Sequence, residues 1–155
     1  MDLRKHYVNG EWVTPLGTQE FPVMNPAKNE QIDTVILGNE KDVDRAVAAA
    51  KAAFETFSQA SKAERLALLK ALLVQTNARM DDLANAITTE MGAPISMAKD
   101  EQAATGLWHL EAFIALLEAQ EDSETLPNGD ILLREPVGVC GLITPWNWPV
   151  NQVAA

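Results

Sequence analysis

The chain has 155 residues, 47% of them hydrophobic and 22% charged, and carries 22 acidic against 12 basic side chains, a formal charge of −10. This composition describes one globular domain that can bury a core without a disulfide or a structural metal, and the acidic balance argues against a nucleic-acid partner. No apolar run approaches the roughly 18 residues of a membrane-spanning helix, and no apolar leader is present, so we expect no membrane partner and a cytoplasmic location.

The start of the chain is expected to form short β-strands. Asn9-Gly10, placed between Tyr7-Val8 and Trp12-Val13, is a strong signal for a two-residue hairpin turn. A second extended stretch ends at Asn25-Pro26, and after a turn at residues 28–30 we expect another strand over residues 32–37.

Helical periodicity begins at Asn39, where apolar residues start to recur at i, i+3 and i+4. Ser61 and Glu64 have the spacing of a capping box, which predicts that a second helix begins there and runs to about Arg79. We expect the apolar faces of these helices to pack into the core.

Two further helices are expected. The third begins at Asp81 or Asp82 and ends at Gly92, and the fourth begins at Pro94 and runs to about Gln120. The apolar stripe of the fourth helix consists of Met97, Leu107, Leu110, Ile114 and Leu117. The acidic residues over 118–124 are expected to be a solvated surface segment, followed by a turn at residues 127–129.

After this turn, the spacing of the apolar residues returns to a period of two, which is typical of a β-strand. Residues 130–135 are expected to form a half-exposed strand, and the apolar residues 137–143 a buried strand of a parallel sheet. This strand leads into a loop over residues 144–148 and a helix that begins at Pro149. Ligands of open α/β sheets bind at the carboxyl ends of strands, so the loop is the expected site of chemistry. The last helix has no stop signal, which suggests a piece of a larger architecture.

The residues around this loop resemble the segment that opens the dinucleotide-binding fold of the aldehyde dehydrogenase superfamily. The resemblance rests on residues 135–149, with Pro145-Trp146-Asn147 as its most specific part. Other matches follow in family order: Tyr7-Val8-Asn9-Gly10-Glu11-Trp12, Asn25-Pro26, residues 42–47, Glu64-Arg65 and Glu90-Met91-Gly92-Ala93-Pro94. Essentially the whole chain is covered, but only the N-terminal portion of such an enzyme.

The resemblance implies an α/β fold in three parts. Residues 1–129 would supply the outer β segments and the helical part of the cofactor-binding domain, residues 130–136 an oligomerisation-type strand, and residues 137–155 the start of the Rossmann-like cofactor fold. The chain has no GxGxxG fingerprint, which agrees with this family, whose dinucleotide fold departs from that pattern. The complete protein is expected to be a homodimer or homotetramer.

The resemblance also implies the oxidation of an aldehyde to a carboxylic acid with NAD, with NADP not excluded. A cysteine thiolate attacks the carbonyl, and the side-chain amide of Asn147 would donate to the developing oxyanion. Residues lining the ribose and nicotinamide end of the cofactor cleft would be Ile143, Thr144, Pro145, Trp146 and Asn147. The nucleophile and the general base belong to downstream sequence, so the chain alone is expected to be inactive.

Alternatives remain open at this point. Without the family, Asn147 between two tryptophans could simply cap the following helix. Cys140 is expected to be structural, inside the buried strand, and Glu90 and Glu135 are not expected to be the general base. No metal site is expected. A monovalent cation occurs in family members, but the sequence identifies no ligand for it.

The whole chain also has a second interpretation: a truncated, non-catalytic module that associates with a full-length subunit. An exposed apolar strand at residues 137–143 would discriminate the two, because an isolated piece leaves it unpaired and prone to association.

Overall fold

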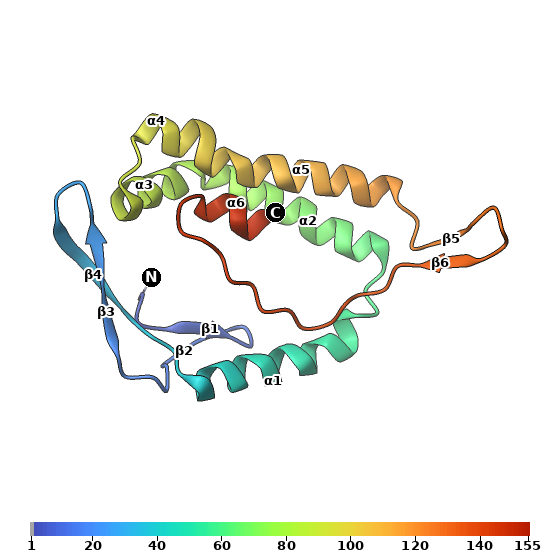
Figure 1. Cartoon of the computed structure of the whole chain (residues 1–155), viewed down its shortest axis with the longest axis horizontal. Helices are drawn as coiled ribbons and strands as arrows, with labels where there is room; N and C mark the ends of the chain where they lie inside the picture. The colour runs from blue at the N-terminus through green and yellow to red at the C-terminus, as the bar shows by residue number, and fades with distance from the viewer. Residues whose placement is uncertain (1) are drawn as a thin grey trace.

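The computed structural model describes residues 2–155, and its mixed helical and β content confirms the expected α/β class (Figure 1). The strands are β1 (His6–Val8), β2 (Glu11–Val13), β3 (Glu20–Asn25), β4 (Glu30–Ile36), β5 (Ser123–Thr125) and β6 (Ile131–Leu133). The helices are α1 (Glu40–Phe57), α2 (Lys62–Ala78), α3 (Met80–Met91), α4 (Ile95–Met97), the π-helix η1 (Ala98–Ala103), α5 (Ala104–Ala119) and α6 (Pro149–Ala154).

The strands pair as three antiparallel hairpins, β1–β2, β3–β4 and β5–β6, within residues 2–155. The hairpin predicted at Asn9-Gly10 is confirmed: φ is 54° at Asn9 and 80° at Gly10, as the tight turn between twisted strands requires. Tyr7 and Trp12 face each other across it, with ring centroids 5.1 Å apart. β4 begins at Glu30, two residues before the expected start, because it pairs with β3 directly from the turn.

The predicted starts of α1 and α2 are confirmed by their caps. Asn39 and Asp42 form a capping box at α1, and Ser61 and Glu64 form one at α2. α3 ends at Gly92 in the left-handed conformation (φ 83°), as the glycine predicted. These signals are local, which explains why they could be identified in the sequence.

The core lies where α3, η1 and α6 meet. Four of the five residues in its buried cluster are alanines, and Val150 of α6 packs against the cluster. The buried cluster consists of Ala84, Ile87, Ala93, Ala98 and Ala103. α2 and α5 lie side by side, α6 packs against α5 (Figure 1), and Leu110 and Ile114 of α5 are buried. None of the helices of residues 2–155 is long and apolar enough to cross a bilayer.

The expected burial of the apolar face of α1 is wrong. Val43 is 60% exposed and Phe57 is 58% exposed. α1 lies apart from the other helices, along the β1–β2 hairpin (Figure 1), and this small hairpin covers little of its face. The periodicity identified the helix correctly, but it cannot indicate whether a partner covers the apolar side.

The fourth helix is not the uninterrupted α-helix that we expected from Pro94 to Gln120. Its first part is α4, which continues through the π-helix η1 into α5. The side-chain hydroxyl of Thr105 donates to the main-chain oxygen of Gln102 at 2.8 Å, which satisfies one carbonyl at the junction. The predicted apolar stripe has no member between Met97 and Leu107, and this gap coincides with the irregular turn.

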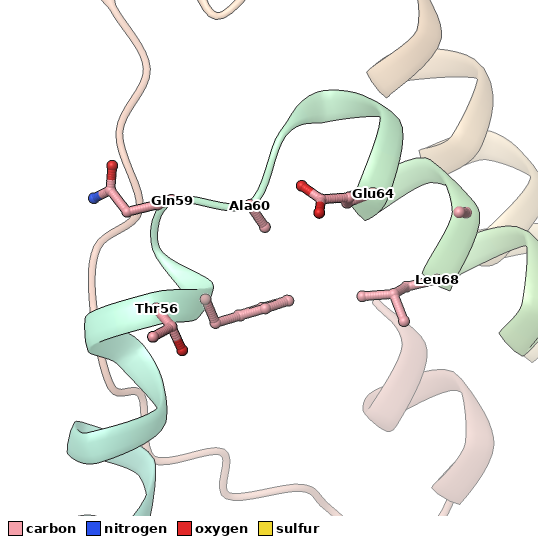
Figure 2. Close-up of a pocket in the computed structure, with 7 residues that line it drawn as sticks. Thr56, Gln59, Ala60, Glu64 and Leu68 are labelled. Atoms are coloured by element: carbon pink, nitrogen blue, oxygen red, sulfur yellow. The ribbon is translucent and has the colours of Figure 1, made fainter.

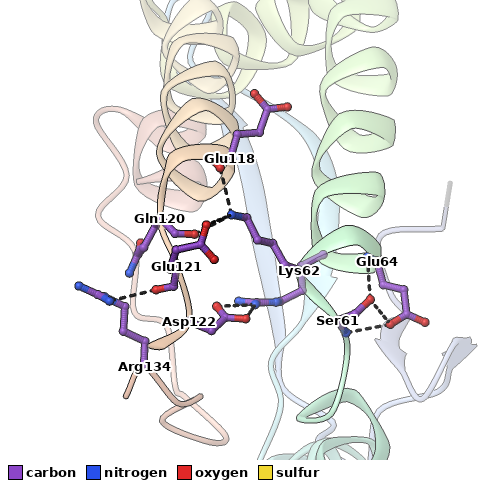
Figure 3. Close-up of polar contacts among 9 residues, drawn as sticks. Ser61, Lys62, Glu64, Glu118, Gln120, Glu121, Asp122 and Arg134 are labelled. Carbon is purple, nitrogen blue, oxygen red and sulfur yellow. Dashed lines mark hydrogen bonds and ion pairs between the residues drawn. The ribbon is translucent and has the colours of Figure 1, made fainter. Parts of the chain in front are cut away.

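The acidic segment after α5 is more ordered than expected. Figure 3 shows Lys62 of α2 beside the end of α5, where its ammonium donates to the main-chain oxygens of Glu118 (3.0 Å) and Gln120 (2.7 Å). Arg65 binds both carboxylate oxygens of Asp122, at 2.9 and 2.8 Å. The segment expected as solvated surface, residues 118–124, is exposed from Glu121 onward, but residues 123–125 also form β5 because they pair with β6.

Two expectations for the following segments are corrected. β6 is exposed on both faces rather than on one, because β5 covers only its edge. Residues 137–143, expected as a buried strand, have no strand partner among residues 2–155 and run as an irregular segment to α6 (Figure 1). A strand needs a neighbour to bond its N–H and C=O groups, and the described residues provide none here.

Candidate functional site

The loop that carries Asn147 leads directly into α6. Pro149 occupies the first turn of that helix, where its missing N–H costs nothing. The N-cap is Trp148, and no side chain makes a capping hydrogen bond there. The capping role that remained open for Asn147 is therefore not the one it has in the structure.

A hydrogen bond holds the main chain of Asn147 in place, whereas its side chain is exposed. Its carbonyl oxygen accepts a hydrogen bond of 2.8 Å from the side-chain Nε2 of Gln102 on η1. The Asn147 residue is exposed, and among residues 2–155 its side-chain amide has no hydrogen-bond partner. The amide is thus available to donate to a group outside the chain.

The other residues predicted for the cofactor cleft form one exposed stretch with Asn147. Ile143 is 98% exposed and Trp146 is 77% exposed, and Thr144 and Pro145 between them are also exposed. The predicted residues are consecutive in the chain, and the structure leaves all five of them exposed.

A pocket of about 640 Å³ lies at the base of this loop. Trp146, Pro149 and Val150 line one side of it, and Leu83, Ile87 and Met91 of α3 line the other. The pocket links the candidate site to the core, because Val150 and α3 also form the buried cluster.

The loop can orient and stabilise, but it cannot move a proton. Residues 143–149 contain no ionisable side chain. The Asn147 amide is neutral and donates without losing a proton, so it suits stabilisation of a negative oxygen. A nucleophile or an acid–base group must come from elsewhere.

Cys140 is exposed, which corrects the expectation that it is buried in a strand. Its thiol lies 3.6 Å from the carbonyl oxygen of Gly138. The expected burial depended on strand neighbours that residues 2–155 do not supply.

The two histidines have separate partners. His6 Nε2 lies 3.0 Å from the main-chain oxygen of Ile36, and His109 Nε2 lies 2.7 Å from Oδ1 of Asn151 on α6. Within residues 2–155, no group of three histidine, cysteine or acidic side chains lies close enough to hold a metal ion.

The ionisable groups with shifted pKa values make hydrogen bonds and ion pairs that stabilise the fold. The main-chain N–H groups of Leu16, Asn39 and Gly17 lower the pKa of Asp42. The hydroxyl and main-chain N–H of Ser61 lower the pKa of Glu64.

Lys99 is another ionisable group with a shifted pKa that stabilises the fold. Its hydrogen bond to Asp81, 2.6 Å long, raises the pKa of its ammonium and ties η1 to α3. None of these groups belongs to residues 143–149.

A second pocket, of about 620 Å³, opens between the end of α1 and the start of α2 (Figure 2). Thr56 and Gln59 lie on one side, and Glu64 and Leu68 on the other. Glu64, the ionisable group among the lining residues, already bonds Ser61. The pocket therefore offers mainly apolar surface, and it includes no residue predicted for the site.

Sequence reasoning missed Gln102. This side chain is 1% exposed and holds the main chain of Asn147 from η1. The signal in the sequence was the gap in the apolar stripe of the fourth helix, where a glutamine stands in a stretch that the periodicity assigned to ordinary packing.

Comparison with known proteins gives a consistent result over nearly the whole chain. A model of the aldehyde dehydrogenase family matches residues 12–155. A 3-succinoylsemialdehyde-pyridine dehydrogenase from a Pseudomonas species is 44% identical over 155 residues, which is 99% of this chain and 32% of the relative.

Solved structures agree in fold. An aldehyde dehydrogenase from Bartonella henselae superposes with a TM-score of 0.94 and 42% identity, covering 97% of this chain and 32% of that one. A variant of aldehyde dehydrogenase C from Pseudomonas syringae, complexed with NAD+ and octanal, gives a TM-score of 0.94 and 40% identity, covering 99% of this chain and 31% of that one. The chain thus spans about a third of the length of the proteins it matches.

Proposed function

The chain belongs to the aldehyde dehydrogenase family, and from this premise we propose that it is the N-terminal portion of an NAD(P)-dependent enzyme that oxidises an aldehyde to a carboxylic acid. The observation that carries the proposal is the Pro145-Trp146-Asn147 loop, in which an anchored main chain presents an unpartnered amide. The complex of the Pseudomonas syringae relative with NAD+ and octanal supports NAD as cofactor and an aldehyde as substrate.

Asn147 stabilises the oxyanion in this scheme. When a thiolate adds to the aldehyde carbonyl, negative charge appears on the carbonyl oxygen. A preorganised N–H donor about 2.7–3.1 Å from that oxygen stabilises the charge only as it develops, which lowers the barrier. The cysteine nucleophile and the glutamate that activates water come from sequence outside these 155 residues.

The cofactor site uses the main chain next to Asn147. Residues Ile143 to Trp146 are exposed and carry no charged side chain, which suits the ribose and the neutral amide end of a nicotinamide cofactor. That cofactor would supply hydride acceptance when bound, and residues Ile143 to Asn147 would hold its ribose and nicotinamide end.

The β5–β6 hairpin is the proposed contact with a second subunit. Ile131 is 66% exposed and Leu133 is 60% exposed on a hairpin that projects from the helices (Figure 1). Apolar side chains on such a hairpin favour burial against another copy, and we place the complete protein in the cytoplasm as a homodimer or homotetramer.

A direct assay tests this function. The full-length protein that carries this segment is expected to reduce NAD+ in the presence of one or more aldehydes from a panel of aliphatic, aromatic and semialdehyde substrates, with NADP+ in parallel. The 155 residues alone are expected to give no NADH. Failure of the full-length protein with every aldehyde and both cofactors, or sustained turnover by the short chain, would contradict the proposal.

A further inference from the structure

The side chain of Gln102 is large and polar, yet it is buried, with only 1% of its surface exposed. Its Nε2 donates to the main-chain oxygen of Asn147 at 2.8 Å and lies 3.6 Å from the sulfur of Met91. Its Oε1 is buried and has no hydrogen-bond partner within the described chain. A buried amide with one unpaired atom destabilises the fold relative to an apolar side chain of the same shape, so a packing role does not account for glutamine here.

The chemistry of the contact defines which end of the amide faces the loop. A main-chain carbonyl can only accept, so the group that meets Asn147 must be the NH₂ of Gln102. Gln102 itself is held in η1, and Thr105 bonds its main-chain oxygen at 2.8 Å. Single π-helical turns within α-helices occur frequently at functional sites. The donor therefore reaches the loop from a rigid, irregular turn.

We propose that Gln102 is a positioning residue for Asn147: by fixing the Asn147 carbonyl, it sets the direction in which the Asn147 side chain leaves the loop toward the oxyanion. This inference rests on the proposed function of Asn147. Trp148 and Pro149 fix the chain on the C-terminal side of Asn147, where α6 begins. The bond from Gln102 fixes the peptide group of Asn147 itself. A displacement of about 1 Å at a catalytic group can cost roughly 100-fold in rate, so the loss of this bond should be visible in turnover.

Two substitutions of similar volume remove the donor. Gln102→Met removes the bond and also the unpaired Oε1, so it should fold at least as stably as the wild type. Gln102→Glu keeps the shape but places an acceptor against the Asn147 carbonyl. In the full-length enzyme, we expect Gln102→Met to lower kcat roughly 10- to 100-fold with the aldehyde KM largely retained, and Gln102→Glu to lower kcat further. Gln19→Met, at an exposed glutamine, is the matched control and should leave kcat unchanged.

A double-mutant cycle separates positioning from a merely structural role. If Gln102 acts through the Asn147 amide, Gln102→Met should lower kcat in the wild type but change it little in the Asn147→Ala background. An equal fold-loss in both backgrounds, or wild-type kcat in a folded Gln102→Met enzyme, would overturn the proposal while the function of Asn147 stands. Wild-type turnover in Asn147→Ala would overturn both.

Discussion

The carboxylate of Asp42 at the start of α1 accepts the main-chain N–H of Leu16 at 2.8 Å, 26 residues earlier in the chain. The N–H groups of Gly17 (2.9 Å) and Asn39 (3.0 Å) bond the same carboxylate. One side chain thus joins the loop before β3, the helix cap and the first turn of α1.

This arrangement predicts a specific pH dependence. The N–H donors lower the folded-state pKa of Asp42 below its unfolded value of about 3.9, so its contribution to stability is complete above about pH 5 and is lost as the pH falls through the folded pKa. Asp42→Asn should lower the Tm near neutral pH, and the difference from wild type should shrink in acid. Asp44→Asn, at an exposed carboxylate of the same helix, is the control. Melting curves that keep a constant Tm difference down to about pH 2 would contradict this.

Gly92 should be intolerant of a side chain. Its φ is +83°, and a Cβ there would lie 2.8 Å from Cγ of Pro26. Gly92→Ala should destabilise by about 2–3 kcal/mol, because left-handed strain adds to a steric conflict. Gly129→Ala separates the two effects, since φ is +92° there but nothing lies within 4 Å. Urea denaturation measures both, and equal losses would show that contact with Pro26 does not matter.

The ion pair of Arg65 and Asp122 should contribute modestly. Both side chains are partly exposed, so a double-mutant cycle with Arg65→Ala and Asp122→Ala should give a coupling of about 0.5–1 kcal/mol, the upper range for such pairs because two bonds form. The coupling should weaken at about 1 M salt. The more exposed pair Arg79–Asp82 should give less. A larger coupling for Arg79–Asp82 would contradict the role of the two hydrogen bonds that one guanidinium nitrogen of Arg65 donates to Asp122.

The short chain should self-associate. Val137 is 95% exposed and Leu142 is 79% exposed on an apolar segment that pairs with no strand in the described part of the chain, residues 2–155. Unpaired apolar segments of this kind promote association between chains. Sedimentation of residues 1–155 should show oligomers or aggregate that the double substitution Val137→Lys and Leu142→Lys reduces. A stable monomer would favour the alternative of an independent module.

What could be predicted from the sequence was local. The hairpin turn at Asn9-Gly10, the helix start at Asn39, the capping box at Ser61 and the stop at Gly92 depend on a few adjacent residues, and the structure has all of them. The motif at residues 145–147 identified the candidate site because the types of its three residues and their order are specific to the family that the chain resembles.

What could not be predicted depends on distant partners. A run such as residues 137–143 is apolar enough for a buried strand, but pairing requires neighbours that residues 2–155 do not provide. The hydrogen bond from Gln102 to Asn147 joins residues 45 positions apart, and helical periodicity carries no information about such a contact. The π-helical turn that carries Gln102 departs from the regular helical period, so that period could not predict it either.

The proposed function depends most on the stabilisation of an oxyanion by Asn147. The most direct test is the steady-state turnover of the full-length enzyme with Asn147→Ala, using NAD+ and an aldehyde that the wild type oxidises. We expect kcat to fall roughly 10²- to 10³-fold while the aldehyde KM is largely retained, and Asn85→Ala, at an exposed asparagine of α3, to behave as wild type. A correctly folded Asn147→Ala enzyme with wild-type kcat would contradict it.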